Sequence, residues 1–200
     1  NNHQLDVDRL YVAEATVGVM ISLSKRFKRK EARLRGGEWG MRIDRGFLLS
    51  GKTVGIIGLG RVGSNLAKRL AGWDVNLLAY DPYVPAGTAM GLDVTMVDLS
   101  TLLAESDFVS VHVDLNDTTT GMFNTIAFEK MKPTAVFINS ARGPLHVSED
   151  LHDALPRCLQ VSTEGVSQLP GDTTSASVAW VAALQSSTVW LRDHLDLDLA

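Results

Sequence analysis

The sequence predicts an α/β protein built on a doubly wound parallel sheet with helices on both faces. Apolar runs of strand length alternate with helical patterns over most of its 200 residues, and this alternation is typical of a parallel sheet covered on both sides. The clearest unit lies between Lys52 and Tyr80, where a short apolar run, a glycine turn, an amphipathic stretch and a second apolar run follow one another. That order indicates a strand, a helix and a parallel strand.

Gly58, Gly60 and Gly63 stand in the spacing G-x-G-x-x-G between the apolar run at 54–57 and the helical pattern after it. The first glycine permits a tight turn, the second lets the backbone approach a pyrophosphate, and the third lets the helix lie close to the sheet. The helix N-terminus adds free N–H donors and partial positive charge. A purely structural turn is the alternative, but the strand before it and the helix after it favour a dinucleotide site.

Asp81 ends the second strand, 75–80, about 20 residues beyond the glycines, where a carboxylate can accept hydrogen bonds from an adenosine ribose. The same carboxylate would repel a 2′-phosphate, which favours NAD over NADP. Pro82 and Tyr83 stand where NADP sites place a basic residue. The expected cofactor is therefore NAD.

Strands and helices continue to alternate beyond this unit, and Asp98, Ser100 and Ser148 are suitable helix caps. The expected elements are a strand at 94–97, a helix to Glu105, a buried strand at 108–113, a polar turn at 116–121, a helix at 124–130, a buried strand at 135–138 and a helix from Ser148 to Leu155. Beyond Pro156, segments 160–168 and 188–191 could each hold a strand.

Upstream of the glycine turn we expect a linker at residues 1–11 and a connecting helical region at 12–49. Glu14 would then stand in the first turn of a helix that ends at Gly36 and Gly37, with Trp39 and Phe47 anchoring the connection. The dinucleotide-binding domain would cover 50–194, and 195–200 would be a tail.

Basic residues crowd positions 25–35, where they could contact phosphate or nucleic acid. The net charge of −4 and the scarcity of nearby aromatics favour a solvated helix face instead. The acidic tail, DHLDLDLA, could suggest a metal site, but no ligand cluster accompanies it, so we expect no metal. The single cysteine, Cys158, cannot form an internal disulfide. With no apolar run near about 20 residues and no signal-peptide pattern, we expect a cytoplasmic protein without membrane or nucleic-acid partners.

Polar residues collect where the predicted strands end, and ligands of doubly wound sheets bind at the carboxyl ends of the strands. His112 and Asp114 follow one buried strand, and Ser140, Ala141 and Arg142 follow another. Arg142 offers a planar fork for a carboxylate; the alternative is a surface arginine paired with a nearby acid. The small residues beside it and its place in the crevice favour the binding role.

Histidines are the candidate proton carriers. His112 could lie beside the cofactor or be a hydrogen-bonded core histidine, and the residues leave both open. His146 and His152 stand near a helix start and are expected to face solvent. His194 follows a short apolar run and is a candidate general acid/base.

Four segments together resemble the NAD-binding domain of the D-isomer-specific 2-hydroxyacid dehydrogenases. They occur in the order and spacing of that family and cover residues 12 to about 155. The segments are VAEATVGVMISLSKR, GKTVGIIGLGRVGSNLAKRLAGWDVNLLAYDPY, LLAESDFVSVHVDLNDTTTGMFN and FEKMKPTAVFINSARG.

The resemblance implies a Rossmann-type fold, a homodimer and hydride transfer between NAD(H) and a small 2-hydroxy or 2-keto acid. Arg142 would hold the substrate carboxylate and His194 would carry the proton. The implied cofactor contacts come from the glycine turn, the ribose acid and the later strand ends: Gly58, Gly60, Arg61, Val62, Gly63, Asp81, His112, Val113, Asp114, Thr119, Ser140, Ala141 and Glu164.

The chain departs from the family pattern at Asp114 and, more strongly, from residue 157 onward. EGVSQLP places Glu164 at the family's aspartate but Leu169 at its catalytic glutamate, so His194 would lack its charge partner. Asp114 replaces a usual proline, and the resemblance implies that most of the substrate domain is absent. Two alternatives therefore stay open: an NAD(H)-binding module with impaired catalysis, and a dimerisation module that uses the helix at 12–35.

Overall fold

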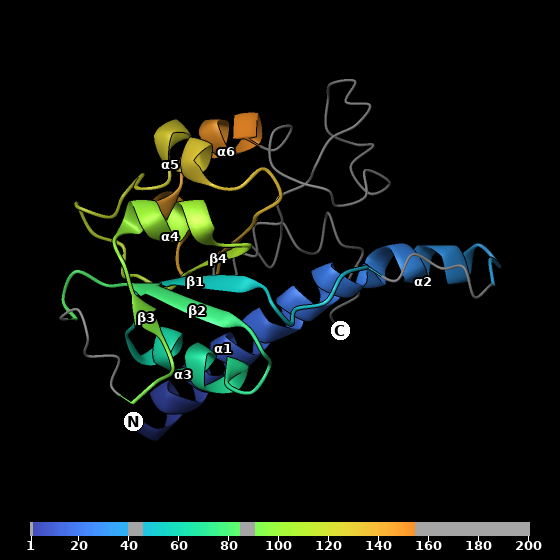
Figure 1. Cartoon of the computed structure of the whole chain (residues 1–200), viewed down its shortest axis with the longest axis horizontal. Helices are drawn as coiled ribbons and strands as arrows, with labels where there is room; N and C mark the ends of the chain where they lie inside the picture. Colours follow the sequence, from blue (N-terminus) through green and yellow to red (C-terminus); the bar gives the residue numbers. More distant parts are fainter. Residues whose placement is uncertain (1, 40–45, 85–90, 155–200) are drawn as a thin grey trace.

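The computed structural model describes residues 2–39, 46–84 and 91–154, and it confirms the predicted fold class. Five parallel strands form one sheet in the order β3-β2-β1-β4-β5 (Figure 1). The first strand, β1, lies in the middle of the sheet. β2 and β3 extend the sheet to one side of β1, and β4 and β5 then extend it to the other side. The strands are β1 Thr53–Ile57, β2 Asn76–Tyr80, β3 Thr95–Met96, β4 Phe108–Val111 and β5 Val136–Asn139.

Helices cover both faces of this sheet. Side chains of α1 and α3 pack in one core cluster, and those of α4, α5 and α6 pack in a second cluster on the opposite face (Figure 1). The described helices are α1 Asn2–Lys25, α2 Phe27–Arg35, α3 Arg61–Leu70, α4 Leu99–Glu105, α5 Thr125–Lys130, α6 Ser148–Ala154 and the short 3₁₀ helix η1 Gly143–Leu145.

The strands β1, β4 and β5 carry mostly apolar side chains on both sides because both faces of the sheet are covered. Every residue of β4 and β5 is buried. Three phenylalanines fill the second cluster, with the ring centroid of Phe137 4.8 Å from that of Phe123 and 5.3 Å from that of Phe128. These runs were recognisable in the sequence as continuous hydrophobic stretches.

The expected caps agree with the structure at Asp98, whereas Ser100 lies inside α4. Asp98 caps α4 by accepting the N–H of Thr101 at 2.9 Å, and Asn124 caps α5. Ser148 is the first residue of α6 rather than a residue before it. β4 ends at Val111, two residues before the expected end, so His112 begins a loop.

The expected linker at 1–11 is wrong in its secondary structure, because α1 already begins at Asn2. The segment is polar, but it contains neither glycine nor proline to interrupt a helix. Glu14 therefore lies in the middle of α1, where its carboxylate pairs with the guanidinium of Arg69 on α3 at 2.7 Å. The pair helps to hold α1 against α3.

A left-handed residue, Arg26 with φ 54°, separates α1 from α2. The second helix ends at Arg35 as expected, with Gly36 as its C-cap. Trp39 is 89% exposed and does not anchor the connection, whereas Phe47 lies 6.1 Å from the ring of Phe108 and does.

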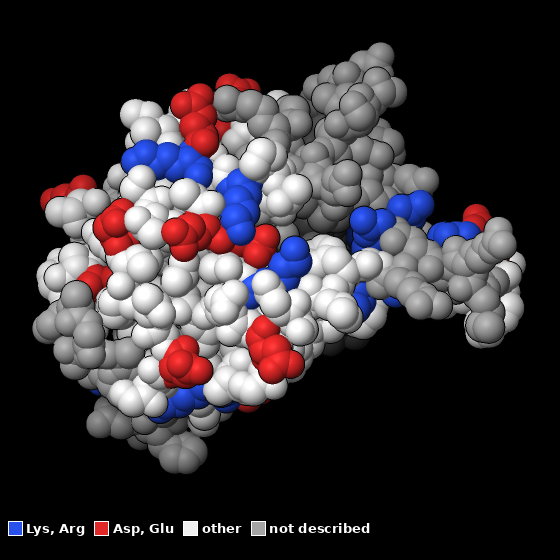
Figure 2. Space-filling view, in the orientation of Figure 1, with Lys and Arg blue, Asp and Glu red and all other residues white. Residues whose placement is uncertain are grey.

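Most of the basic run lies on α2, a helix with no buried residue, while Lys25 ends α1 and Arg26 separates the two helices. Figure 2 shows the lysines and arginines of α2 gathered where this helix extends from the sheet. Arg33 pairs with Glu38 at 2.7 Å, and Arg35 pairs with Glu31 at 2.8 Å. These pairs match a solvated helix face.

An ionic cluster lies at the amino ends of the strands. The Asp107 carboxylate accepts the N–H of Thr53 at 2.9 Å, and it lies 3.8 Å from the ammonium of Lys52 and 3.4 Å from that of Lys132. The cluster ties the start of β1 to the start of β4. Within the three described ranges, no helix combines the length and apolarity that crossing a bilayer would need.

Candidate functional site

The site is built on one row of residues across the sheet. The strand register aligns the last residues of four strands as Tyr80, Ile57, Val111 and Asn139. The next residue of each strand is a predicted site residue, namely Asp81, Gly58, His112 and Ser140. Because all four strands are parallel, these residues lie together at the carboxyl ends of the strands. Doubly wound sheets bind their ligands at this end of the sheet.

Gly58 and Gly63 are required by the protein's own packing. Gly58 has φ +89°, and a Cβ there would lie 2.9 Å from the carbonyl oxygen of His112. A Cβ on Gly63 would collide with the carbonyl oxygen of Gly58. These two glycines therefore bring strand, turn and helix into close contact.

Gly60 differs from both, because the protein itself does not require a glycine there. It is exposed, its φ is −69°, and no atom lies within 4 Å of the position a Cβ would occupy. It is the N-cap of α3 and supplies no side chain to the amides of the first helical turn, which have no acceptor inside the helix. Open space above free helical N–H groups fits a phosphate group.

The carboxylate of Asp81, the residue expected to bind the ribose, is hydrogen-bonded to the glycine turn. One carboxylate oxygen accepts the N–H of Leu59 at 2.9 Å, and the other accepts the N–H of Tyr83 at 2.9 Å. Each oxygen keeps a second lone pair that a ribose hydroxyl could use. The residues at this edge therefore fit a dinucleotide.

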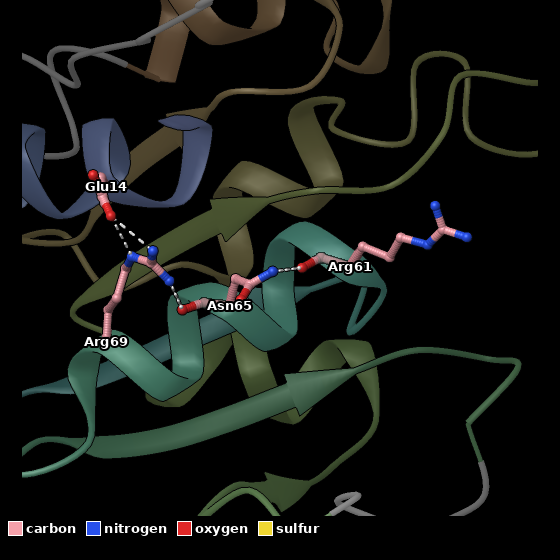
Figure 3. Close-up of polar contacts among 4 residues, drawn as sticks. All are labelled: Glu14, Arg61, Asn65 and Arg69. Carbon is pink, nitrogen blue, oxygen red and sulfur yellow. Dashed lines mark hydrogen bonds and ion pairs between the residues drawn. The ribbon is translucent and has the colours of Figure 1, made fainter. Parts of the chain in front are cut away.

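The first turn of α3 presents one exposed side chain and one anchored one. Figure 3 shows Arg61 extending away from Glu14 and Arg69, while its carbonyl accepts the Asn65 amide at 2.8 Å. Val62 instead packs against the core. Val62 could therefore serve a pyrophosphate through its backbone N–H, and Arg61 through its guanidinium as well.

His112 is hydrogen-bonded at both ring nitrogens. Its Nε2 lies 2.9 Å from the hydroxyl of Ser110, and its Nδ1 lies 3.1 Å from the hydroxyl of Ser140. Burial lowers the pKa of His112 from 6.5 to about 4, so the ring is neutral at pH 7. The geometry matches a hydrogen-bonded core histidine that connects the ends of β4 and β5, with its backbone against Gly58.

The loop after His112 supplies the remaining predicted contacts. The Cγ1 of Val113 reaches within 3.0 Å of the Cβ position of Gly58. Thr119 is engaged in its own turn, because its hydroxyl donates to the carbonyl of Asp114 at 2.7 Å and accepts the N–H of Asn116 at 2.8 Å. Asp114 itself is exposed.

Arg142 is exposed at the carboxyl end of β5, in a loop that the Asn139 side chain organises. The Asn139 amide oxygen accepts the N–H of Ala141 at 3.1 Å, and its nitrogen donates to the carbonyl of Arg142 at 2.7 Å. Arg142 also donates to the Ala141 carbonyl at 2.8 Å. Sequence reasoning missed Asn139; its position at the end of an apolar strand was the available signal.

His146 was expected to face solvent, and that expectation is wrong. It is half-buried, its ring centroid lies 6.3 Å from that of Phe137, and its Nδ1 lies 3.2 Å from the Asn139 amide nitrogen. His152 is exposed, as expected. His194, Glu164 and Leu169 lie outside the described residues.

Comparison with known proteins finds one family and several relatives that match this chain. Residues 17–158 match the family model of the D-isomer specific 2-hydroxyacid dehydrogenase, NAD binding domain. The chain is 36% identical to D-3-phosphoglycerate dehydrogenase of Methanocaldococcus jannaschii, over 75% of this chain and 29% of that protein. It is 39% identical to D-lactate dehydrogenase of Escherichia coli, over 72% of this chain and 44% of that protein.

A crystal structure of D-lactate dehydrogenase from Aquifex aeolicus, complexed with NAD and lactic acid, superposes with a TM-score of 0.67 at 32% identity. That match covers 72% of this chain and 43% of the other. The chain thus spans less than half the length of these relatives. It belongs to the NAD-binding domain family of the D-isomer specific 2-hydroxyacid dehydrogenases, and NAD is the cofactor.

Proposed function

We propose that this chain is the cofactor-binding part of an NAD-dependent dehydrogenase that transfers hydride between NAD(H) and a small 2-hydroxy or 2-keto acid. The observation that carries the proposal is the position of Arg142. It follows β5 at the carboxyl end of the sheet, where the glycine turn also lies. The names of the relatives support the substrate class, since they act on D-lactate and 3-phosphoglycerate.

The roles follow from the position of each group. Backbone amides at Gly60 and Val62, with the Arg61 guanidinium, would hold the pyrophosphate, and Asp81 would hold the adenosine ribose. Arg142 would bind the substrate carboxylate through paired hydrogen bonds and so orient the neighbouring carbon. His194 would give or take the proton at the substrate oxygen. Bound NAD supplies the hydride acceptor or donor.

The test begins with NADH fluorescence titration, followed by turnover with glyoxylate, pyruvate and hydroxypyruvate. We expect saturable binding and turnover of at least one acid. Arg142→Ala should lose turnover and keep NADH affinity, while Arg142→Lys, which keeps the charge but not the planar fork, should retain a small part of the activity. Turnover that persists unchanged in Arg142→Ala would contradict the assignment.

A second function is an NAD(H)-binding module that performs no chemistry. Leu169 supports it, because a leucine at the glutamate position cannot stabilise a charged imidazole at His194. Saturable NADH binding with no turnover of any of the three acids would favour this second function. Loss of NADH binding altogether would contradict both.

We further propose a cytoplasmic homodimer that uses α1. Val7, Leu10 and Tyr11 expose 45%, 38% and 68% of their surface on this helix, an apolar stretch that a second copy could cover. Light scattering of the purified chain should give twice the monomer mass of 21.7 kDa. Tyr11→Glu should shift that mass toward the monomer, and an unchanged mass would argue against α1 as the contact.

A further inference from the structure

The side-chain amide of Asn139 makes three hydrogen bonds, and together they fix which way it points. Its oxygen accepts the N–H of Ala141 at 3.1 Å. Its nitrogen has two hydrogens, one donated to the carbonyl of Arg142 at 2.7 Å and one directed at Nδ1 of His146 at 3.2 Å. A flipped amide would set its oxygen against the Arg142 carbonyl and its N–H₂ against the Ala141 N–H, so only one orientation satisfies the loop.

The orientation of Asn139 in turn assigns the His146 tautomer. Because Asn139 approaches Nδ1 with an N–H, Nδ1 must be an acceptor and the proton of the neutral ring must lie on Nε2. The ring is held edge-on to Phe137, and His146 also pairs with Phe123 in an isolated parallel bridge. Packing therefore limits how far the imidazole can turn.

We propose that His146 is a positioning residue for Arg142: by accepting a hydrogen bond at Nδ1, it keeps Asn139 in the one orientation that fixes the backbone of Ala141 and Arg142. The proposal rests on the carboxylate-binding role proposed for Arg142. His146 touches neither substrate nor cofactor in this scheme and acts only through Asn139.

Protonation of His146 would break this arrangement. A proton on Nδ1 would face the Asn139 N–H₂, so either the ring or the amide must rotate, and Ala141 and Arg142 would lose their partners. Burial lowers the pKa of His146, so the neutral ring persists to below the usual pH for histidine. The loop should therefore be ordered at neutral pH and loosen as the pH falls.

The groups that interact with His146 in the described part of the chain carry no charge. They are the Phe137 ring and the Asn139 amide on β5, the backbone of Phe123 before α5, and the Gly143 carbonyl of η1. On α6, the Asp150 carboxylate accepts the N–H of Thr125 instead. His112 contacts the hydroxyl of Ser140, next to the loop, so its titration could also reach the loop.

The experiment uses ¹⁵N NMR on the 200-residue chain and on two variants. In His146→Asn the amide oxygen can replace Nδ1 as acceptor but cannot titrate, whereas His146→Leu offers no acceptor. We expect the wild-type imidazole to carry its proton on Nε2 at pH 7. The amide signals of Ala141 and Arg142 should shift with a midpoint below pH 6.5.

The two variants separate positioning from packing. His146→Asn should keep the neutral-pH positions of the Ala141 and Arg142 signals and abolish their titration. Since His112 is unchanged in this variant, loss of the titration excludes His112 as its source. His146→Leu should displace both signals at every pH and speed the hydrogen exchange of the Ala141 amide at least several-fold. A proton on Nδ1, or unchanged signals in His146→Leu, would overturn the proposal.

A binding measurement connects the loop to Arg142. With NADH saturating, the dissociation constant of oxamate, a 2-keto acid analogue, should rise about tenfold in His146→Leu and stay near wild type in His146→Asn, while NADH affinity is unchanged in both. If wild type binds no oxamate, the role proposed for Arg142 fails, and the NMR result still decides whether His146 sets the loop.

Discussion

The carboxylate of Asp81 accepts hydrogen bonds from the backbone of Leu59 on one side and from that of Tyr83 on the other. It therefore holds the end of β2 to the glycine turn. The sequence predicts its ribose role from spacing alone, but not these two backbone contacts, which depend on how the neighbouring turns fold.

Asp81→Ala should weaken NADH binding by about 1–3 kcal/mol, the usual cost of losing a hydrogen bond to a charged group. Fluorescence titration gives the dissociation constant. Asp81→Asn keeps one acceptor oxygen and should lose less affinity. Since Leu59 and Tyr83 also lose an acceptor in the alanine variant, a melting curve of each variant separates damage to the turn from the lost ribose contact. Equal NADH affinity in all three proteins would remove Asp81 from the site.

His112 makes the stability of the fold depend on pH. Its pKa is about 4 in the folded protein against 6.5 for a free histidine, so the unfolded chain binds the extra proton between these values. Stability contributed by the neutral ring is complete above pH 6.5 and is lost as the pH falls toward about 4. The pKa difference of about 2.5 units corresponds to roughly 3.5 kcal/mol, at about 1.4 kcal/mol for each unit.

Urea unfolding of the wild type and His112→Asn at pH 7, 6, 5 and 4.5 measures this loss as the difference between the two proteins, because His146, whose pKa burial also lowers, titrates in both. His112→Asn, which can still bond with one serine hydroxyl, should be less stable at pH 7 but should show a flatter pH dependence over the same window. The Asp98 carboxylate does not confuse the result, because its pKa is lowered from 3.8 and it titrates below the window. Parallel pH dependences for the two proteins would contradict the role of His112.

The turn between β1 and α3 combines glycines with different tasks. Gly63 is buried against Gly58, while Gly60 faces open space at the N-terminus of the helix. The three motif positions are all glycine, so the sequence alone predicts their separate roles only by analogy with other G-x-G-x-x-G turns. The structure separates the glycine that a ligand would need from those that the fold needs.

Gly60→Ala and Gly63→Ala should therefore fail in different ways. Gly60→Ala should keep the unfolding free energy within about 0.5 kcal/mol, as for a surface substitution, yet weaken NADH binding, because its Cβ enters the space left for the pyrophosphate. Gly63→Ala should lower stability by about 1–3 kcal/mol through overpacking. Urea unfolding and NADH titration of both variants check this, and a stable Gly60→Ala protein with unchanged affinity would contradict the assignment.

The elements that sequence predicts well are those with a strong local signal. β4 and β5 stand out because all their residues are buried and most are apolar, with Ser110 and Asn139 as the polar exceptions, and α4 stands out because Asp98 caps it. The break at Arg26 has no such signal, since neither glycine nor proline marks it. The contact between Asn139 and His146 joins residues on opposite sides of a tight loop, and no periodicity reveals it.

For the whole molecule, NAD binding should stabilise the fold by mass action. At an NAD(H) concentration about 100 times the dissociation constant, the gain is about 2.7 kcal/mol, which corresponds to a rise in melting temperature of about 5–10 °C for a chain of this size. Thermal unfolding with NADH and, as a matched control, NADPH checks this. NADPH should protect less, because Asp81 repels a 2′-phosphate, and equal protection would argue against the cofactor preference.

The ionic cluster around Asp107 lies at the amino ends of β1 and β4, while every predicted site residue in the described part of the chain lies at or beyond the carboxyl ends of the strands. One consequence concerns protein engineering. Loops at the binding edge could be exchanged with those of relatives while the opposite edge continues to hold the sheet together. Libraries that randomise the exposed positions 114 and 142 and keep the buried Ser140 should therefore contain a high fraction of folded members.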